Sequence, residues 1–165
     1  MGSKTAALPK KLQNAITERM RQSLLKGDTP FDKARLADAA SFVGALAADR
    51  TFGRSSMAIE SISDERRLTR IAIVNDDMPF IVDSVAATIA ALGLSIDRLV
   101  HPVIPVERDD KGRLTGIPDN DPDDAYWESM IYIEAARVDA KTRRQLQESL
   151  KEPLADVRAA VSDWP

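Results

Sequence analysis

The sequence predicts an α+β protein in which a four-stranded antiparallel sheet carries two helices on one face and follows two N-terminal helices. Three observations predict it. Apolar residues recur every three to four positions in four segments, alternate at every second position in others, and one expected strand contains two prolines. We divide the chain into an N-terminal helical extension, residues 1–54, and a sheet domain, residues 55–165.

The first third is expected to form two helices. The stripe Leu12, Ile16, Met20 and Leu24 lies along one helix, which Pro9 begins and Lys26-Gly27 ends. The segment Asp28-Thr29-Pro30 offers a cap and a first-turn proline for the second helix. Its apolar face comprises Phe31, Ala39, Phe42, Val43 and Leu46.

The next segments predict an antiparallel hairpin followed by a helix. Strands 57–62 and 68–74 flank the polar turn at residues 64–66. A helix then begins at Pro79, with Asp76 and Asp77 expected to cap it. Gly93 closes this helix in a left-handed conformation, and Leu94 packs back against it.

The second half predicts two more strands and a long helix. Strand 95–106 must lie at a sheet edge, because Pro102 and Pro105 cannot donate ladder hydrogen bonds. Residues 115–125 are expected to be a mobile loop, and residues 127–137 a strand. Helix 139–163 follows, and Pro153 should kink or split it. The apolar face of this helix comprises Leu146, Leu150, Leu154, Val157 and Val161.

The order of elements after the extension is β-β-α-β-β-α. A ferredoxin-like sheet has the order β-α-β-β-α-β, and the strand at 57–62 can fill the edge that its last strand would occupy. The proline-bearing strand then falls at the opposite edge, so two independent signals agree. The outer face of the sheet is apolar and must be covered by the N-terminal helices or by another domain. Its residues are Ala72, Val74, Met130 and Tyr132.

Composition bounds the partners of the chain. Its 165 residues are 44% hydrophobic and 30% charged, as is usual for a globular protein, and none is cysteine. The net charge of -3 gives no general attraction to nucleic acid or to an anionic membrane. No apolar run is long enough to cross a bilayer, and the start lacks a signal peptide. We therefore expect a cytoplasmic protein.

Motifs for catalysis, metal binding and cofactor binding are missing. The sequence contains no glycine-rich phosphate loop. His101 is the only histidine, and a structural hydrogen-bonding role is expected rather than a catalytic one. The acidic stretch 119–124 lacks the spacing of a calcium loop. The basic clusters 66–70 and 141–144 lie among acids, so a salt-linked surface is expected.

Several ordered stretches resemble the large bacterial NAD-specific glutamate dehydrogenases. The segment Asn75-Asp76-Asp77-Met78-Pro79-Phe80-Ile81-Val82-Asp83-Ser84 is similar to that family's "DDMPFLVDS". The segments His101-Pro102-Val103 and 108–114 resemble its "HPV" and "RD..G.L" stretches. Matches follow in the same order at Glu128-Ser129, Ile133-Glu134, 155–161 and Asp163-Trp164.

The resemblance implies a regulatory or assembly role. The family's chains are very long, oxidise L-glutamate to 2-oxoglutarate and ammonia with NAD, and form homo-oligomers. Their N-terminal region carries ACT-type domains, ferredoxin-like modules that bind amino acids in other enzymes. We accordingly expect the natural chain to continue past Pro165, with no catalytic, cofactor-binding or metal-binding residue in this part.

Two roles therefore stand side by side. The first is an amino-acid effector site, with a carboxylate held by backbone N–H groups where a helix begins. The second is a purely structural domain for oligomerisation or docking. Phe80 stands where amino-acid-binding ACT domains commonly have glycine, and its ring is expected to fill the effector space. The candidate effector residues are Asn75, Asp76, Asp77, Met78, Pro79, Phe80, Asp83, Ser84 and His101.

Overall fold

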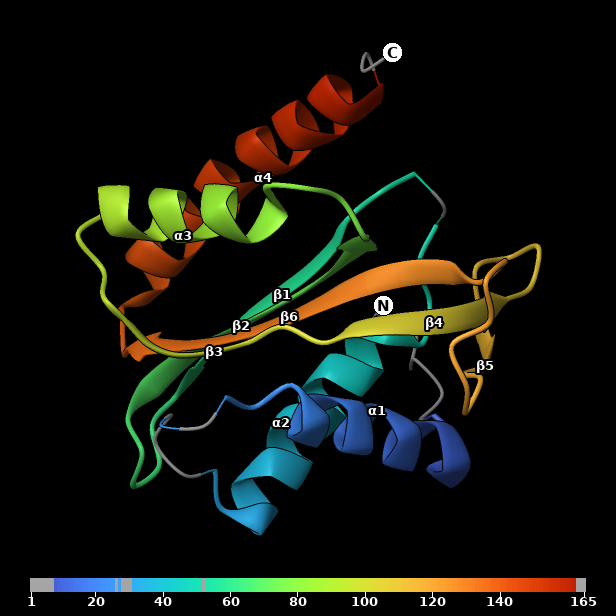
Figure 1. The fold of residues 1–165 in the computed structure, drawn as a ribbon. Coiled ribbons are helices and arrows are strands. Elements are labelled where there is room, and N and C mark those ends of the chain that lie inside the picture. The colour runs from blue at the N-terminus through green and yellow to red at the C-terminus, as the bar shows by residue number, and fades with distance from the viewer. Residues whose placement is uncertain (1–7, 26, 28–30, 52, 163–165) are drawn as a thin grey trace.

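The protein is a single antiparallel sheet between two layers of helices. The structure, a computed structural model, describes residues 8–25, 27, 31–51 and 53–162, and only the backbone of 157–162. In Figure 1 helices α3 and α4 lie on one side of the sheet, and α1 and α2 on the other. The elements are α1 (Lys10–Gln22), α2 (Lys33–Ala47), β1 (Ser56–Ile62), β2 (Leu68–Asp76), α3 (Ile81–Ala91), β3 (Ile96–Val100), β4 (Val103–Arg108), β5 (Leu114–Gly116), β6 (Tyr126–Ala136) and α4 (Ala140–Ser162).

The sheet has the order β1-β2-β6-β4-β5, and β3 also pairs with β6. All of the pairings are antiparallel. The predicted hairpin is confirmed, with Met57 opposite Ile73 and Ile59 opposite Ile71. Strand β1 therefore fills the edge beside β2, as the order of the elements predicted.

The strand predicted at 95–106 is two strands, so the expectation of four strands is wrong. Strands β3 and β4 both pair with β6, and the chain leaves the ladder at His101 and Pro102 between them. Pro102 has no N–H to donate, but its carbonyl accepts a hydrogen bond from the Met130 N–H at 3.0 Å. The proline interrupts the strand without detaching it from β6.

The prediction of a mobile loop at 115–125 is wrong at its start. Residues 115 and 116 belong to β5, which pairs with β4 at Glu107 and Arg108. Arg19 of α1 holds the following segment, because its guanidinium donates to the Pro118 carbonyl at 3.2 Å and pairs with Asp121 at 3.0 Å. At Glu107 and Arg108, strand β4 is therefore covered by β5 and is not the edge strand of the sheet. Pro105 precedes these two residues and lies outside the pairing with β5.

Two apolar clusters fill the spaces between the layers. One cluster joins the sheet to α3 and α4. The sheet contributes Ile71, Ile73, Ile131 and Ile133, and the helices contribute Val85, Ile89, Leu146 and Leu150. On the opposite face, α1 and α2 cover the apolar surface of the sheet. That second cluster joins Ile16, Met20, Ala40 and Val43 to Ala72, Val74, Met130 and Tyr132. Of the two alternatives for this face, the N-terminal helices are the one observed.

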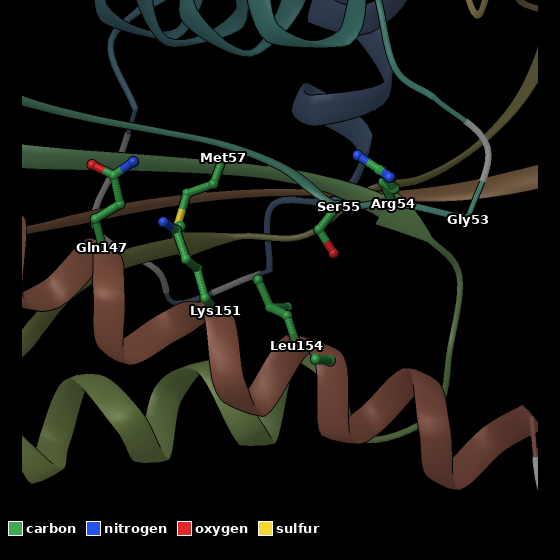
Figure 2. Close-up of a pocket in the computed structure, with 8 residues that line it drawn as sticks. Gly53, Arg54, Ser55, Met57, Gln147, Lys151 and Leu154 are labelled. Atoms are coloured by element: carbon green, nitrogen blue, oxygen red, sulfur yellow. The ribbon is translucent and has the colours of Figure 1, made fainter.

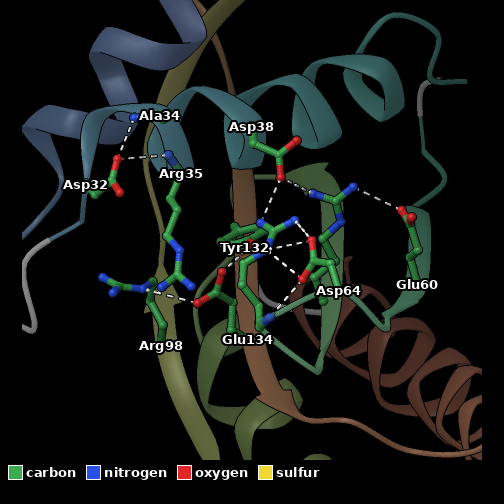
Figure 3. Close-up of polar contacts among 11 residues, drawn as sticks. Asp32, Ala34, Arg35, Asp38, Glu60, Asp64, Arg98, Tyr132 and Glu134 are labelled. Carbon is green, nitrogen blue, oxygen red and sulfur yellow. Dashed lines mark hydrogen bonds and ion pairs between the residues drawn. The ribbon is translucent and has the colours of Figure 1, made fainter.

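Aromatic and charged side chains fix α2 to the sheet, and Figure 3 shows the charged contacts around Asp38 and Tyr132. The rings of Phe31 and Phe42 lie 6.3 Å and 6.4 Å from that of Tyr132. Asp38 of α2 pairs with Arg66 at 3.1 Å and with Arg70 at 3.0 Å. The expected salt-linked surface is confirmed for these two arginines. Their ion pairs with Asp38 also hold α2 against the sheet.

The helix ends follow the predicted chemistry in part. Gly93 has φ +79, and the Leu94 N–H donates to the Ile89 carbonyl, as expected for a glycine-terminated helix. Helix α4 runs unbroken through Pro153, so the helix is not split there, and the alternative of a kink stays a prediction. A missing N–H removes one hydrogen bond, and the neighbouring turns retain theirs.

Other predicted features lie partly outside the described residues. These are Lys26 of the first stop signal, the cap Asp28-Thr29-Pro30, Trp164, and the side chains of Val157 and Val161. The N-cap of helix α2 is Asp32, whose carboxylate accepts from the Ala34 and Arg35 N–H groups at 2.8 Å and 3.4 Å. Among the helices of the described part, none is long and apolar enough to cross a membrane.

Candidate functional site

Polar residues from five separated segments meet at one end of the sheet. Here β2 ends opposite the beginning of β6, so Asn75 pairs with Ser129 and Asp76 with Glu128. Alternate residues of a strand point to opposite faces. The two pairs therefore build two different polar groups, one on each side of the sheet.

A buried ion cluster lies on the side of α1 and α2. Arg50, which follows α2, donates to Glu128 Oε2 at 3.0 Å and to Asp76 Oδ1 at 2.6 Å. Arg108 of β4 also donates to Glu128, from Nε to Oε2 at 2.9 Å and from Nη2 to Oε1 at 2.8 Å. The side chains of Arg50, Arg108 and Glu128 are fully buried. Two guanidinium groups and two carboxylates balance, which offsets the high cost of removing isolated charges from water.

The turn between β4 and β5 completes this cluster. The Gly112 carbonyl accepts hydrogen bonds from Arg108 Nη1 at 2.8 Å and from the Arg50 N–H at 3.0 Å. Gly112 has φ +85, and a Cβ atom at this position would overlap the Arg50 carbonyl oxygen. The segment after α2 is thus bonded through Arg50 to the turn between β4 and β5 and to Glu128.

A second polar group lies on the side of α3. The Ser129 hydroxyl donates to Asp77 Oδ1 at 3.0 Å and lies 3.0 Å from His101 Nε2. Because the hydroxyl proton points to the carboxylate, the imidazole must donate its own Nε2 proton to Ser129. Burial lowers the pKa of His101, and the smaller influence of the Asp77 charge opposes this shift. The imidazole is therefore not placed to take the serine proton, so the trio links strands and does not activate a nucleophile.

The candidate effector residues are only partly brought together. Asp77 and His101 meet through Ser129, and Asn75 is buried beside them, with its Oδ1 accepting from the Ser55 hydroxyl at 2.9 Å. Asp76 lies apart from them, in the ion cluster on the opposite face. Of the rest, Met78 and Ser84 are half-buried, while Pro79, Phe80 and Asp83 are exposed.

The beginning of α3 differs from the prediction. The helix begins at Ile81 and its N-cap is Phe80, with no side-chain hydrogen bond to the cap. Capping by Asp76 and Asp77 is therefore wrong, because Arg50 and Ser129 engage those carboxylates. Phe80 adopts φ +70, a conformation that glycine accepts more easily. Phe80 is 63% exposed, and the expectation that its ring fills an effector space stays a prediction.

Sequence reasoning missed the residues that organise this end of the sheet. Arg50 carried no signal, because its partners lie 26 and 78 positions away. Glu128 did carry one, since it shares a strand face with Met130 and Tyr132, where an unpaired charge would be costly. Arg108, Gly112 and Ser129 lay inside the family-like stretches but had no assigned role.

An α+β chain with a curled antiparallel sheet and four helices is compatible with the ACT-like class of domains. The chain belongs to the glutamate dehydrogenase ACT1 domain family, whose model matches residues 29–150. It is 37% identical over 99 residues to an NAD-specific glutamate dehydrogenase of Halomonas elongata, and 34% identical over 99 residues to one of Pseudomonas aeruginosa. Each alignment covers 58% of this chain and 6% of the relative. No solved structure matches the chain.

Proposed function

We propose that this chain is an N-terminal regulatory or assembly domain of an NAD-specific glutamate dehydrogenase, with a ferredoxin-like, ACT-type arrangement of its sheet. The parent chain would oxidise L-glutamate to 2-oxoglutarate and ammonia with NAD, as a cytoplasmic homo-oligomer. The observation that carries the proposal is the family match over residues 29–150. Because the curated relatives are far longer, catalysis and NAD binding are assigned to the remainder of the parent chain.

The polar groups of the described part support a non-catalytic role. Arg50, Arg108 and Glu128 neutralise one another in a buried cluster. Ser129 is fully buried, and its proton is directed to Asp77 rather than to His101. A nucleophile needs a base that can accept its proton, and this geometry does not provide one.

For the regulatory role, the proposed effector site is the turn from Asn75 to Phe80 with Asp83, Ser84 and His101. Helix α3 begins there without a side-chain cap, so its first N–H groups can hold a carboxylate. Asp83 lies in the first turn, and Asp77 is exposed nearby, so these carboxylates favour an amine. A site that holds a carboxylate at the helix N–H groups and an amine at these aspartates suits a zwitterionic amino acid. Asp76 would contribute through its backbone, because its carboxylate faces the other side.

Calorimetry of the chain with glutamate, aspartate and arginine tests the effector site. We expect a saturable heat with at least one of them, lost in Asp77→Asn and retained in the control Asp123→Asn, an exposed loop residue. Flat titrations at roughly millimolar ligand would remove the effector role. The domain would then have a purely structural role.

The alternative is a purely structural domain for oligomerisation or docking, and the exposed ring of Phe80 favours it. The apolar outer face of the sheet is covered by α1 and α2 and is not available for such contacts. In the parent enzyme we would replace Phe80 by serine and measure molecular mass by light scattering, together with glutamate turnover. A structural role predicts altered assembly with unchanged effector response.

Removal of the whole domain from the parent enzyme tests both roles together. The expected result is a change in assembly or in the response of glutamate oxidation to amino acids. An enzyme that keeps its mass, turnover and effector response without this domain would contradict the proposal.

A further inference from the structure

A pocket of about 370 Å³ lies between the beginning of β1 and the middle of α4. Figure 2 shows Gln147, Lys151 and Leu154 on α4 facing the segment that carries Arg54, Ser55 and Met57. Its volume lies within the range of small-molecule sites. It is separate from the proposed effector turn, none of whose residues lines it.

The charge of this pocket is positive. Arg54 and Lys151 line it beside the polar side chains of Ser55 and Gln147, and no acidic residue does so among the described residues. Lys151 also pairs with Glu148 at 3.0 Å, outside the lining. Within the described part of the chain, no hydrogen bond or ion pair engages the Arg54 guanidinium, whereas nearby Arg50 is fully paired. An unengaged guanidinium at a concave site favours a carboxylate.

The remaining wall of the pocket is apolar. Leu154 is 4% exposed and Met57 is half-buried, so both present fixed aliphatic surface. A ligand must therefore bring negative charge toward Arg54 and Lys151 and a short carbon chain toward this wall. Two cations beside one apolar wall match a molecule with two carboxylates.

We propose that this pocket binds a small aliphatic dicarboxylate. Arg54 and Lys151 hold the two carboxylates, and Met57 and Leu154 contact the carbon chain. The site is linked to the effector turn through Ser55, whose hydroxyl donates to Asn75 Oδ1 at 2.9 Å. A ligand that accepts the Ser55 proton removes this bond and alters the environment of Asn75.

Titration of the 165-residue chain with glutarate, followed by amide NMR and calorimetry, tests the pocket. The expected result is roughly millimolar affinity, with shift changes at residues 53–57, at 147–155 and at Asn75. Arg54→Gln and Lys151→Gln should each weaken binding about tenfold, because each removes a charge-assisted contact. Arg54→Lys should weaken it less.

Two controls separate pocket binding from general charge effects. Lys141→Gln removes an exposed positive charge from α4 outside the pocket and should leave the affinity unchanged. Glutaramide, the neutral diamide of the same length, should not bind. Arg54 and Lys151 are exposed, so their replacement should leave the thermal transition in place.

Three outcomes would overturn the proposal. They are the absence of glutarate binding at about ten times the expected Kd, equal affinity in Arg54→Gln and the parent sequence, and shift changes confined to the beginning of α3. The last would place the anion at the effector turn instead. Loss of amino-acid binding at that turn would leave the pocket proposal intact.

Discussion

At the residue scale, this protein is marked by charges that are buried and fully paired. Glu128 accepts four hydrogen bonds from two arginines, and its side chain is inaccessible to solvent. A carboxylate in such surroundings is stabilised only while both guanidinium groups remain in place. Glu128 therefore interrupts the apolar face of β6 and joins that strand to Arg50 and to Arg108 of β4.

Replacing Glu128 by glutamine should strongly destabilise the fold. The substitution leaves two buried guanidinium groups with the single carboxylate of Asp76, so we expect a loss of about 3 kcal/mol or more in the free energy of unfolding. Urea unfolding at neutral pH measures it. Glu60→Gln, which removes an exposed partner of Arg70, should cost less than about 1 kcal/mol. Equal losses in the two variants would contradict the role given to the cluster.

His101 should make stability depend on pH. Burial lowers its pKa in the folded state, so the unfolded chain takes up the proton first as the pH falls below about 6.5. The free energy of unfolding should therefore decrease as the pH falls through that value, down to the folded-state pKa. His101→Gln keeps a donor for Ser129 and should flatten this decrease.

The measurement is direct because the sequence contains one histidine. Its single imidazole signal in NMR should titrate below the value of a free histidine. An unshifted titration, or an unchanged pH profile of stability in His101→Gln, would count against the buried link to Ser129.

At the element scale, the turn between β4 and β5 has a specific task. It presents the Gly112 carbonyl to Arg50 and Arg108, and so fastens the segment after α2 to the sheet. Gly93 provides a comparison, because it has a similar φ but a Cβ atom there would meet no other part of the protein within 4 Å. Substitutions at the two glycines therefore share the backbone strain, and only the one at Gly112 adds a steric overlap.

Gly112→Ala should therefore cost more than Gly93→Ala. Each alanine incurs the strain of a left-handed backbone, about 1–2 kcal/mol. At residue 112 the methyl group also displaces the Arg50 carbonyl, and overpacking adds about 1–3 kcal/mol. Thermal unfolding of both variants gives the difference. Identical transition temperatures would show that the contact with Arg50 is not tight.

At the scale of the whole molecule, the N-terminal helices are part of the architecture. They cover the apolar face that contains Val74, Met130 and Tyr132, and the Arg50 segment after α2 enters the ion cluster. The family match also begins at residue 29, before α2. The division into an extension of residues 1–54 and an ACT-like domain of residues 55–165 stays a prediction, which truncation can test.

Removing residues 1–54 should leave a chain that does not unfold cooperatively. The truncation exposes a contiguous apolar sheet face and leaves Glu128 without Arg50, so we expect binding of a hydrophobic dye and aggregation on gel filtration. Far-ultraviolet circular dichroism during urea unfolding measures the cooperativity. A monomeric fragment with a sharp transition would show instead that the extension is dispensable.

The sequence by itself determined the local elements and their faces. Apolar periods of 3.6 and 2 placed the hairpin, the helices and the two apolar surfaces, because each period follows from backbone geometry that neighbouring residues share. The glycine that ends α3 was equally readable, since a positive φ is a local demand. The resemblance to the glutamate dehydrogenase family was also carried by short, ordered stretches.

Only the tertiary structure decided how the charged residues are used. Asp76 and Asp77 looked like caps of the next helix, yet they face opposite sides of the sheet and bind Arg50 and Ser129. Those partners are distant in sequence, and no local pattern encodes which charge will be desolvated beside which. Burial makes an unpaired charge costly, so long-range pairing overrides the local preference for capping.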